Sequence, residues 1–339
     1  MQKEKKLIFK YIPTAVCLAA VLFFNGCGET NSEDTHIEAS YTNEVSETPG
    51  GEALQPVNNL GTALSVPTQI TKIGNLYFIV DCYNDQVIYS ENLGAPLNEW
   101  YVMTSDIDKG HTVASDGQVY LVDDTERGRI LVFEYDGNVF SNTQVFENVG
   151  TRPHFIVYNE ADSCFYVWSS MTGEMYVFEH DPGSSQMYIS RIMKLDELDG
   201  VYVRSFTIEG DSVYLVSGNS QIIEARISDF KVVDRYAVPP ELAGMIQIMP
   251  VDGGYYITVS TDVNGNQDFA TIIFTESLND LPNGSYTDIY SYFVGGGTPY
   301  YMGCIDGKYY LTEHRLPGHS IWSFDIGEDH MPENVNLIY

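Results

Sequence analysis

The stretch Asp116-Gly-Gln-Val-Tyr-Leu-Val-Asp123 decides the fold, because variants of it recur along the chain. Each copy has a short turn followed by a tyrosine within an apolar run. The aligned tyrosines are Tyr77, Tyr120, Tyr166, Tyr214, Tyr256 and Tyr310, separated by 43, 46, 48, 42 and 54 residues. Strand-rich repeats of this length are typical of β-propellers, with one repeat per blade. The sequence therefore predicts an all-β, six-bladed β-propeller over residues 60–339.

Each repeat contains four segments with the composition of strands. An apolar inner strand precedes the turn and the tyrosine strand follows it. In the second repeat, residues 129–133 and 144–147 supply the third and the outer strand. We therefore expect four antiparallel strands per blade. A circular array must also be closed, and either residues 63–66 or residues 335–339 complete the sixth blade.

Residues 117–137 carry a family resemblance. Their sequence, Gly-Gln-Val-Tyr-Leu-Val-Asp-Asp-Thr-Glu-Arg-Gly-Arg-Ile-Leu-Val-Phe-Glu-Tyr-Asp-Gly, resembles an NHL repeat, with Arg129, Ile130 and Phe133 in the expected places. Residues 76–89 match more weakly, and the other four repeats keep only the strand plan. The resemblance implies an NHL-like propeller, over the whole folded region as architecture and over about two blades as sequence.

The N-terminus predicts export from the cytoplasm. Four lysines within the first ten residues precede an apolar run over residues 12–24 that ends at Asn-Gly-Cys27. This run is short for a spanning helix, which needs about 20 apolar residues. Gly26 and Cys27 resemble a bacterial lipobox, which implies a signal peptide over residues 1–27, lipidation of Cys27 and an extracytoplasmic, membrane-anchored protein. An uncleaved anchor helix is the alternative.

Residues 28–59 have few large apolar side chains and many acids and hydroxyls. Such a segment cannot bury enough surface to offset its ordering entropy, so we expect a disordered acidic tether. The propeller should therefore be held at a distance from the membrane by this segment.

Charge and cysteine content limit the partners. The chain has 17 basic and 47 acidic residues, a net charge of −30. Nucleic-acid binding requires a basic surface, so we expect no nucleic-acid partner, and membrane contact only through the lipid anchor. Beyond the signal, Cys82, Cys164 and Cys304 lie in or at the ends of apolar runs, which predicts buried free thiols and no disulfide framework.

Polar residues recur at the start of the innermost strands. Aligning the repeats by their tyrosines, with some slack in the third and fourth, gives the equivalent residues Thr68, His111, His154, Arg204, Gln247 and Tyr301. Innermost strands line the channel of a propeller, so we expect these side chains to form a polar ring at one face. Nearby loops add Arg152 and Asp123 to the same face.

The sequence contains candidate ligands for two metals, zinc and calcium. The propeller also resembles the peptidyl-amidoglycolate lyases, and that resemblance implies zinc held by three channel histidines. Here only His111 and His154 are available, and Asp123 or Asp124 could supply an oxygen ligand if their loop folds inward. Separately, Asp262, Asn264, Asn266 and Asp268 have the spacing of a calcium loop. The bidentate Glu of such loops is absent, and Asn264-Gly265 is a common hairpin turn, so a turn is favoured.

Two functions follow from the polar ring. Arg152, Arg204 and the histidines could receive an anionic or carboxylate-bearing ligand, because Arg offers a bidentate fork, and tyrosines could stack on sugar rings. We therefore favour a binding or scaffold module for a glycan, peptide or protein, acting through the channel face. The alternative is a metal-assisted lyase or hydrolase at the channel mouth.

Overall fold

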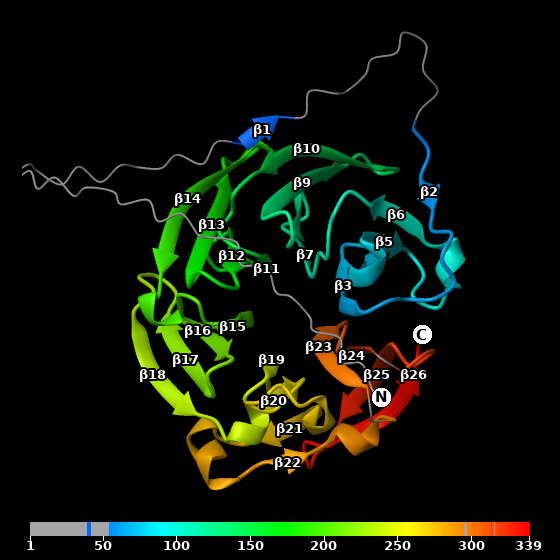
Figure 1. Cartoon of the computed structure of the whole chain (residues 1–339). Coiled ribbons are helices and arrows are strands. Elements are labelled where there is room, and N and C mark those ends of the chain that lie inside the picture. The colour runs from blue at the N-terminus through cyan, green and yellow to red at the C-terminus, as the bar shows by residue number, and fades with distance from the viewer. Residues whose placement is uncertain (1–38, 42–53, 295–296, 315) are drawn as a thin grey trace, which may run out of the picture. The chain divides into compact units, whose positions relative to one another are not determined.

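A computed structural model describes residues 39–41, 54–294, 297–314 and 316–339 of the protein. Its strands form six antiparallel sheets that radiate from a central channel (Figure 1). The prediction of a six-bladed β-propeller with four antiparallel strands per blade is confirmed. The predicted signal peptide and its lipidated cysteine, Cys27, lie outside the described residues.

The first three blades follow one another along the chain. Blade 1 holds β3 (Pro67–Ile73), β4 (Leu76–Asp81), β5 (Gln86–Ser90) and β6 (Tyr101–Thr104). Blade 2 holds β7 (Val113–Ser115), β8 (Tyr120–Asp124), β9 (Arg129–Tyr135) and β10 (Phe140–Phe146). Blade 3 holds β11 (Pro153–Asn159), β12 (Cys164–Ser169), β13 (Glu174–His180) and β14 (Met187–Lys194). In every blade the strands pair in chain order, from the channel outward.

The last three blades repeat this plan. Blade 4 holds β15 (Val203–Glu209), β16 (Ser212–Ser217), β17 (Gln221–Arg226) and β18 (Val232–Ala237). Blade 5 holds β19 (Met245–Val251), β20 (Gly254–Val259), β21 (Thr271–Thr275) and β22 (Thr287–Asp288). Blade 6 holds β23 (Thr298–Ile305), β24 (Lys308–His314), β25 (Ile321–Ile326) and β26 (Pro332–Leu337). Each of the six aligned tyrosines lies in the second strand of its blade.

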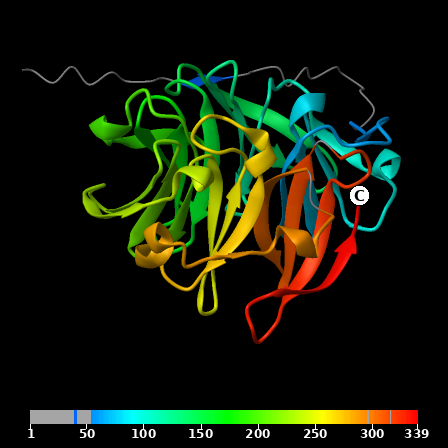
Figure 2. The same ribbon diagram turned by 60° about the horizontal axis from the view of Figure 1, so that its bottom comes forward.

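The hydrophobic core lies between neighbouring blades. Successive side chains of a strand point to opposite faces of its sheet, so each blade contributes to two clusters. In blade 2, Tyr120 and Val122 pack toward blade 1, whereas Leu121 packs toward blade 3. Burial of each such large apolar side chain contributes about 1.5–3 kcal/mol. Figure 2 shows the sheets in a tilted view, with loops joining the strands at both faces.

The ring is closed by contacts between complete blades. The outer strand of blade 6 is β26, so the C-terminal segment, one of the two predicted options, completes this blade. The Tyr339 hydroxyl then reaches blade 1, where it donates to the Ala95 carbonyl at 2.6 Å and accepts from Trp100 Nε1 at 3.0 Å. An ion pair between Lys72 and Asp306 joins the same two blades. Tyr339 therefore joins the sixth blade to the first.

Two short parts of the segment predicted to be a tether form strands. β1 (Ala39–Tyr41) pairs with β10, and β2 (Val57–Asn58) pairs with β6. Both add to the outer edge of a blade, where backbone N–H and C=O groups are otherwise unpaired. Among the described residues, no helix is long and apolar enough to cross a membrane.

The predicted buried thiols are found at two of three positions. Cys82 and Cys164 are buried and free, whereas Cys304 is free but exposed. The prediction was wrong for Cys304, which lies near the end of β23, close to the turn that leads into β24.

Candidate functional site at the channel mouth

The innermost strands share an irregularity at their starts. A β-bulge interrupts the pairing of first and second strands in five blades, for example between Pro153 and Phe155, where His154 is the extra residue. A bulge re-aims the side chain of the extra residue. In blade 2 the equivalent position is His111, just before the paired residues of β7. We call these six equivalent positions the bulge ring: Thr68, His111, His154, Arg204, Ile246 and Tyr300.

This register corrects the predicted ring in two blades. Gln247 pairs with Thr258, so the extra residue of blade 5 is Ile246. The Gln247 N–H donates to the Thr258 hydroxyl, and in blade 6 the Tyr301 N–H donates to the Thr312 hydroxyl. Tyr301 is therefore equivalent to Gln247, and Tyr300 is the extra residue of blade 6. A shift of one residue moves a side chain to the other side of a strand. Gln247 and Tyr301 therefore line a different cavity, of about 430 Å³, toward the opposite ends of the inner strands.

A second set of residues lies two positions before the bulge ring. It consists of Val66, Lys109, Arg152, Tyr202, Gly244 and Thr298, which we call the entry ring. Val66, Lys109 and Arg152 have φ values of 59°, 57° and 59°, in the left-handed region that residues with a Cβ rarely adopt. Such backbone strain is concentrated at functional sites. Every member except Gly244 contributes to the wall of one cavity.

That cavity, the channel mouth, has a volume of about 330 Å³. Three predicted site residues, His111, Arg152 and Arg204, lie in its wall, and the fully buried His154 lies beneath it. Thr68 is buried instead, with its hydroxyl donating to the His111 carbonyl at 3.0 Å. The structure thus brings together four of the eight predicted residues at the mouth.

Asp123 supports the mouth from behind. Its carboxylate accepts hydrogen bonds from the N–H groups of His111 and Thr112, at 2.9 and 2.6 Å, and from the hydroxyls of Thr112 and Thr125, both at 2.8 Å. The side chain is fully buried. Both oxygens are occupied by donors, so Asp123 holds the entry to blade 2 in place and does not turn into the cavity.

The two histidines are in contact with each other. Their ring centroids are 3.6 Å apart. His154 Nε2 lies 3.0 Å from the Tyr300 hydroxyl and 3.5 Å from the Tyr202 hydroxyl, whereas its Nδ1 is buried without a partner. Burial lowers the pKa of His154 well below its usual value, and the nearby His111, Arg204 and Arg152 lower it further. His154 is therefore neutral at physiological pH.

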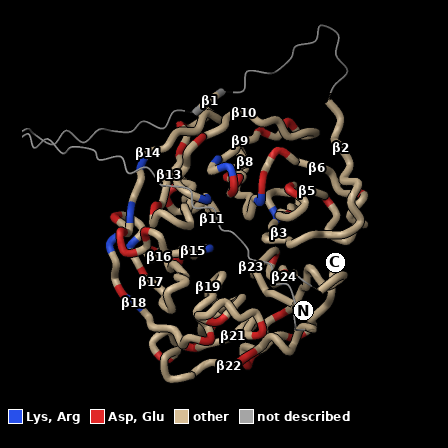
Figure 3. The backbone as a smooth tube through the Cα atoms, in the orientation of Figure 1, with Lys and Arg blue, Asp and Glu red and all other residues tan. Residues whose placement is uncertain are grey.

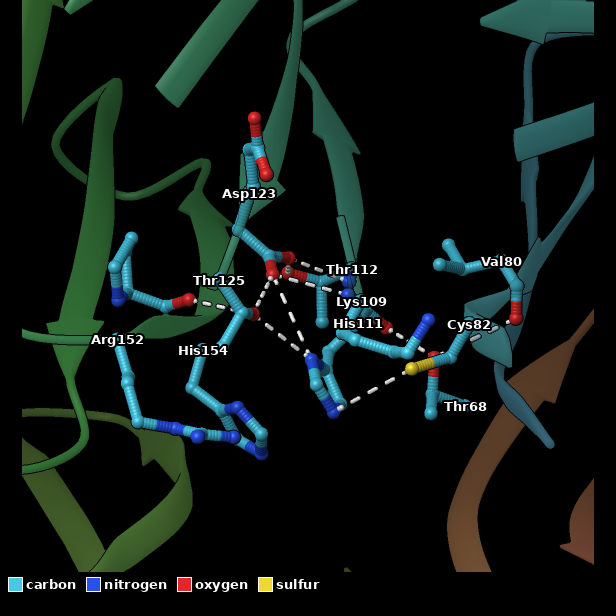
Figure 4. Close-up of polar contacts among 12 residues, drawn as sticks. Thr68, Val80, Cys82, Lys109, His111, Thr112, Asp123, Thr125, Arg152 and His154 are labelled. Atoms are coloured by element: carbon cyan, nitrogen blue, oxygen red, sulfur yellow. Dashed lines mark hydrogen bonds and ion pairs between the residues drawn. The ribbon is translucent and has the colours of Figure 1, made fainter. Parts of the chain in front are cut away.

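His111 connects two neighbouring blades (Figure 4). Its Nδ1 lies 2.9 Å from the Thr125 hydroxyl, and its Nε2 lies 3.8 Å from Cys82 Sγ of blade 1. Burial and the charge of Asp123 raise the pKa of the Cys82 thiol, which is therefore protonated. The pair is a neutral thiol beside an imidazole, not an activated nucleophile.

Three cations surround the mouth of this strongly acidic protein. Lys109 pairs with Asp85 at 2.7 Å, and Arg152 pairs with Glu126 at 2.8 Å. Arg204 instead donates to the Ser260 hydroxyl at 2.7 Å and lies 5.1 Å from the centre of the Tyr202 ring. No carboxylate of the described residues lies within ion-pair distance of it. Figure 3 shows basic positions at β11 and β15 near the channel, while acidic positions are spread over all blades.

Neither of the two candidate metal sites has a set of ligands arranged around a metal position among the described residues. Within the described part of the chain, no group of three His, Cys, Asp or Glu side chains has the geometry of a metal site. At the predicted calcium loop, Asp262 Oδ1 accepts the N–H groups of Asn264 and Asn266, both at 2.8 Å. The Gly265 N–H closes a β-turn onto the Asp262 carbonyl, and Asp268 donates its N–H to the Asn266 side chain. These oxygens thus shape the loop itself.

Sequence alignment missed several residues of the mouth. Tyr202 and Thr298 belong to the entry ring, Tyr300 to the bulge ring, and Cys82 to the loop after β4. Side chains two residues apart along a strand point to the same face. Tyr202 and Thr298 could therefore have been identified from their positions two residues before Arg204 and Tyr300. Cys82 has no such signal, because it reaches His111 only through contact between blades.

Comparison with known proteins supports the fold alone. No protein-family model matches the chain, and no curated protein matches it. A putative 6-phosphogluconolactonase from Bacteroides uniformis superposes with a TM-score of 0.55 at 14% identity, over 81% of this chain and 89% of that one. Kuenenia stuttgartiensis hydrazine synthase gives 0.55 at 15% identity, over 81% and 79%. The WD40 propeller of Doa1 gives 0.54 at 10% identity, over 84% and 86%. Propellers host unrelated activities, so function must come from the site.

Proposed function

We propose that the protein is an extracytoplasmic, lipid-anchored binding module whose channel mouth holds an anionic group of a glycan, peptide or protein. The anchor rests on the lipobox-like Gly26 and Cys27. The NHL relationship, inferred from residues 117–137, is part of the same proposal. The binding function rests on the chemistry of the mouth.

Arg204 carries the argument for an anionic ligand. Its guanidinium is half-buried, stacks on Tyr202 and has no carboxylate partner among the described residues. A partly desolvated cation gains most from an anion that it can bind through two N–H groups. Arg152, which also pairs with Glu126, reinforces this preference, because its guanidinium lies 5.9 Å from the centre of the same Tyr202 ring. A carboxylate in the mouth would therefore receive two cations around one aromatic ring.

A metal-assisted lyase or hydrolase is the second candidate. The observation in its favour is the contact of the Cys82 thiol with His111, beside a second imidazole. The neighbouring arginines oppose it, because the charges that lower the pKa of His154 also repel a divalent cation. The same electrostatics favours an anion.

Titration with malonate, a small dicarboxylate, tests the binding function. At constant ionic strength, we expect malonate to raise the melting temperature of the purified protein through preferential binding to the folded state. Arg204→Gln should abolish the shift. Arg235→Gln is the matched control. Arg235 is exposed on the outer strand β18, where it pairs with Glu197, and it takes no part in the mouth. Equal shifts in all three proteins would contradict the proposal.

The anchor is tested separately. A Cys27→Ser variant should move from the membrane fraction to the soluble extracytoplasmic fraction when expressed with its own N-terminus. Retention of this variant in the membrane would favour the uncleaved anchor helix.

A further inference from the structure

We infer that the anionic group is the carboxylate of an acidic saccharide, so that the mouth holds a uronate residue of a glycan chain. This inference rests on the proposed binding function and names its ligand class. Three features of the mouth carry it: a free cation, a lining of hydroxyls, and an exposed aromatic ring at the rim.

The cation defines where the carboxylate binds. Arg204 projects from the bulge of β15 toward Tyr202 and Ser260. A carboxylate on a sugar ring is planar and compact, which suits the fork of a guanidinium. The remaining faces of the sugar would then lie against the other side chains of the mouth.

Those side chains are rich in hydrogen-bonding groups. Ser260, Thr261, Tyr202 and Tyr300 bring hydroxyls to the wall of the cavity. In addition, Arg152 Nε, Thr298 Oγ1 and the underlying His154 Nδ1 are buried without a hydrogen-bond partner. Leaving such buried groups unpaired is unfavourable. A ligand with several hydroxyls can pair with the hydroxyls of the cavity wall, directly or through water, whereas an apolar peptide side chain cannot.

Tyr83 supplies the aromatic surface. Its side chain is 60% exposed, although it lies in the wall of the mouth. Lys109 Nζ stands 5.2 Å from the centre of its ring. The C–H bonds on one side of a pyranose form an apolar face that packs on such a ring while the hydroxyls remain available for hydrogen bonds. An exposed tyrosine beside a cation therefore fits an acidic sugar.

The cavity also accommodates a chain of sugars. Val66, Tyr83 and Gln267 line both the mouth and a second cavity of about 630 Å³, which continues toward Leu97 and Tyr339 at the boundary of blades 1 and 6. Volumes of this size are usual for bound ligands. We therefore place the uronate in the mouth and the adjoining sugars over Tyr83.

Calorimetric titration with matched trisaccharides tests the inference. The acidic probes are the trimers of galacturonate, glucuronate and mannuronate, and the neutral ones are the trimers of galactose, glucose and mannose with the same linkages. The two members of a pair differ only at C6 of each sugar, which is a carboxylate in the acidic trimer and a CH2OH group in the neutral one. We expect at least one uronate trimer to bind about 10- to 100-fold more tightly than its neutral counterpart, the ratio typical of a hydrogen-bonded charge.

Variants locate the binding. Arg204→Gln should remove most of the preference for the acidic trimer, and Tyr83→Ala should weaken both members of the pair. Arg235→Gln should change neither. Equal affinity for all acidic and neutral trimers would overturn the inference, as would a uronate preference that persists in Arg204→Gln.

A peptide arm separates this inference from the proposed function. The probe is a pentapeptide with a free C-terminal carboxylate, compared with its C-terminal amide. If only the free peptide binds, and Arg204→Gln removes that binding, the anion-binding function stands and the saccharide assignment is wrong. If malonate, peptide and uronates all fail to bind, both proposals are wrong.

Discussion

The two ends of the channel are built from neighbouring residues of the same strands, yet their chemistry differs. At the mouth, the bulge ring presents His111, Arg204 and Tyr300 to a cavity. One residue further along, Gln247 and Tyr301 belong to the cavity at the other end. Because side chains alternate along a strand, a single step separates the two sets. One set joins the blades, and we propose that the other binds a ligand.

The joining role is visible in hydrogen bonds between adjacent inner strands. Gln247 donates to the Met302 carbonyl at 2.9 Å and accepts from the Met302 N–H at 2.6 Å. Gln69 accepts the Val113 N–H at 2.8 Å in the same manner. Parallel inner strands of different blades do not form a sheet, so these amides replace the missing backbone ladder. At the mouth, by contrast, Arg204 donates to the Ser260 hydroxyl without a carboxylate partner among the described residues, and His154 Nδ1 is buried without a hydrogen-bond partner.

The largest effect is expected at Asp123, which supports the mouth. Asp123→Ala should lower the free energy of unfolding by about 3–5 kcal/mol, because it leaves two backbone N–H groups and the Thr112 hydroxyl buried without their acceptor. Urea unfolding measures this loss. Asp123→Asn retains one side-chain oxygen and should lose less. Wild-type stability in Asp123→Ala would show that the carboxylate is not structural.

Gln247→Ala tests the opposite end. It should lower the free energy of unfolding by about 1–3 kcal/mol, because the Met302 N–H and carbonyl lose their buried partner. Affinity for an anionic ligand should stay at the wild-type value. A loss of affinity comparable to that of Arg204→Gln would erase the distinction between the two ends.

The neutral His154 predicts a dependence of stability on pH. Burial and the nearby positive charges lower its pKa in the folded protein, while the unfolded chain binds a proton near pH 6.5. Below that pH the unfolded state holds more protons, so stability falls as pH falls. His154→Phe should reduce this fall between pH 6.5 and 5, measured by urea unfolding. An unchanged slope would mean that His154 is protonated in the folded protein.

His180 lies at the opposite face and should behave in the opposite sense. Burial works against protonation, but the hydrogen bond of Nε2 to Asp116 Oδ2, at 2.6 Å, raises the pKa of His180. Its contribution is complete below pH 6.5 and is lost as pH rises through the raised pKa. The stability difference between wild type and His180→Gln should therefore shrink from pH 6 to pH 9. A difference that grows over this range would contradict the assignment.

The smallest expected effect concerns zinc. Because arginines flank His111 and His154, added zinc should leave the melting temperature of the wild type unchanged. Metal analysis of the purified protein provides a second measurement. Stoichiometric zinc that is lost in a His111→Ala, His154→Ala double variant would favour the metal-assisted alternative.

The blades could be predicted from the sequence, whereas the exact residues of the bulge ring could not. Repeated tyrosines mark the second strand of each blade, because the strand period and the turn are local properties. The bulges are not visible in that period, so alignment placed the ring one residue late at Gln247 and Tyr301. The left-handed conformations of Val66, Lys109 and Arg152 were equally hidden, since none of them is glycine. Contacts between blades, such as Cys82 with His111, require the closed ring.

A crystal structure of the protein grown with malonate tests the central claim most directly. We predict a malonate carboxylate within hydrogen-bond distance of the Arg204 guanidinium, inside the channel mouth, and none in the cavity lined by Gln247 and Tyr301. A mouth that holds only water while malonate binds elsewhere, or a metal ion between His111 and His154, would contradict it.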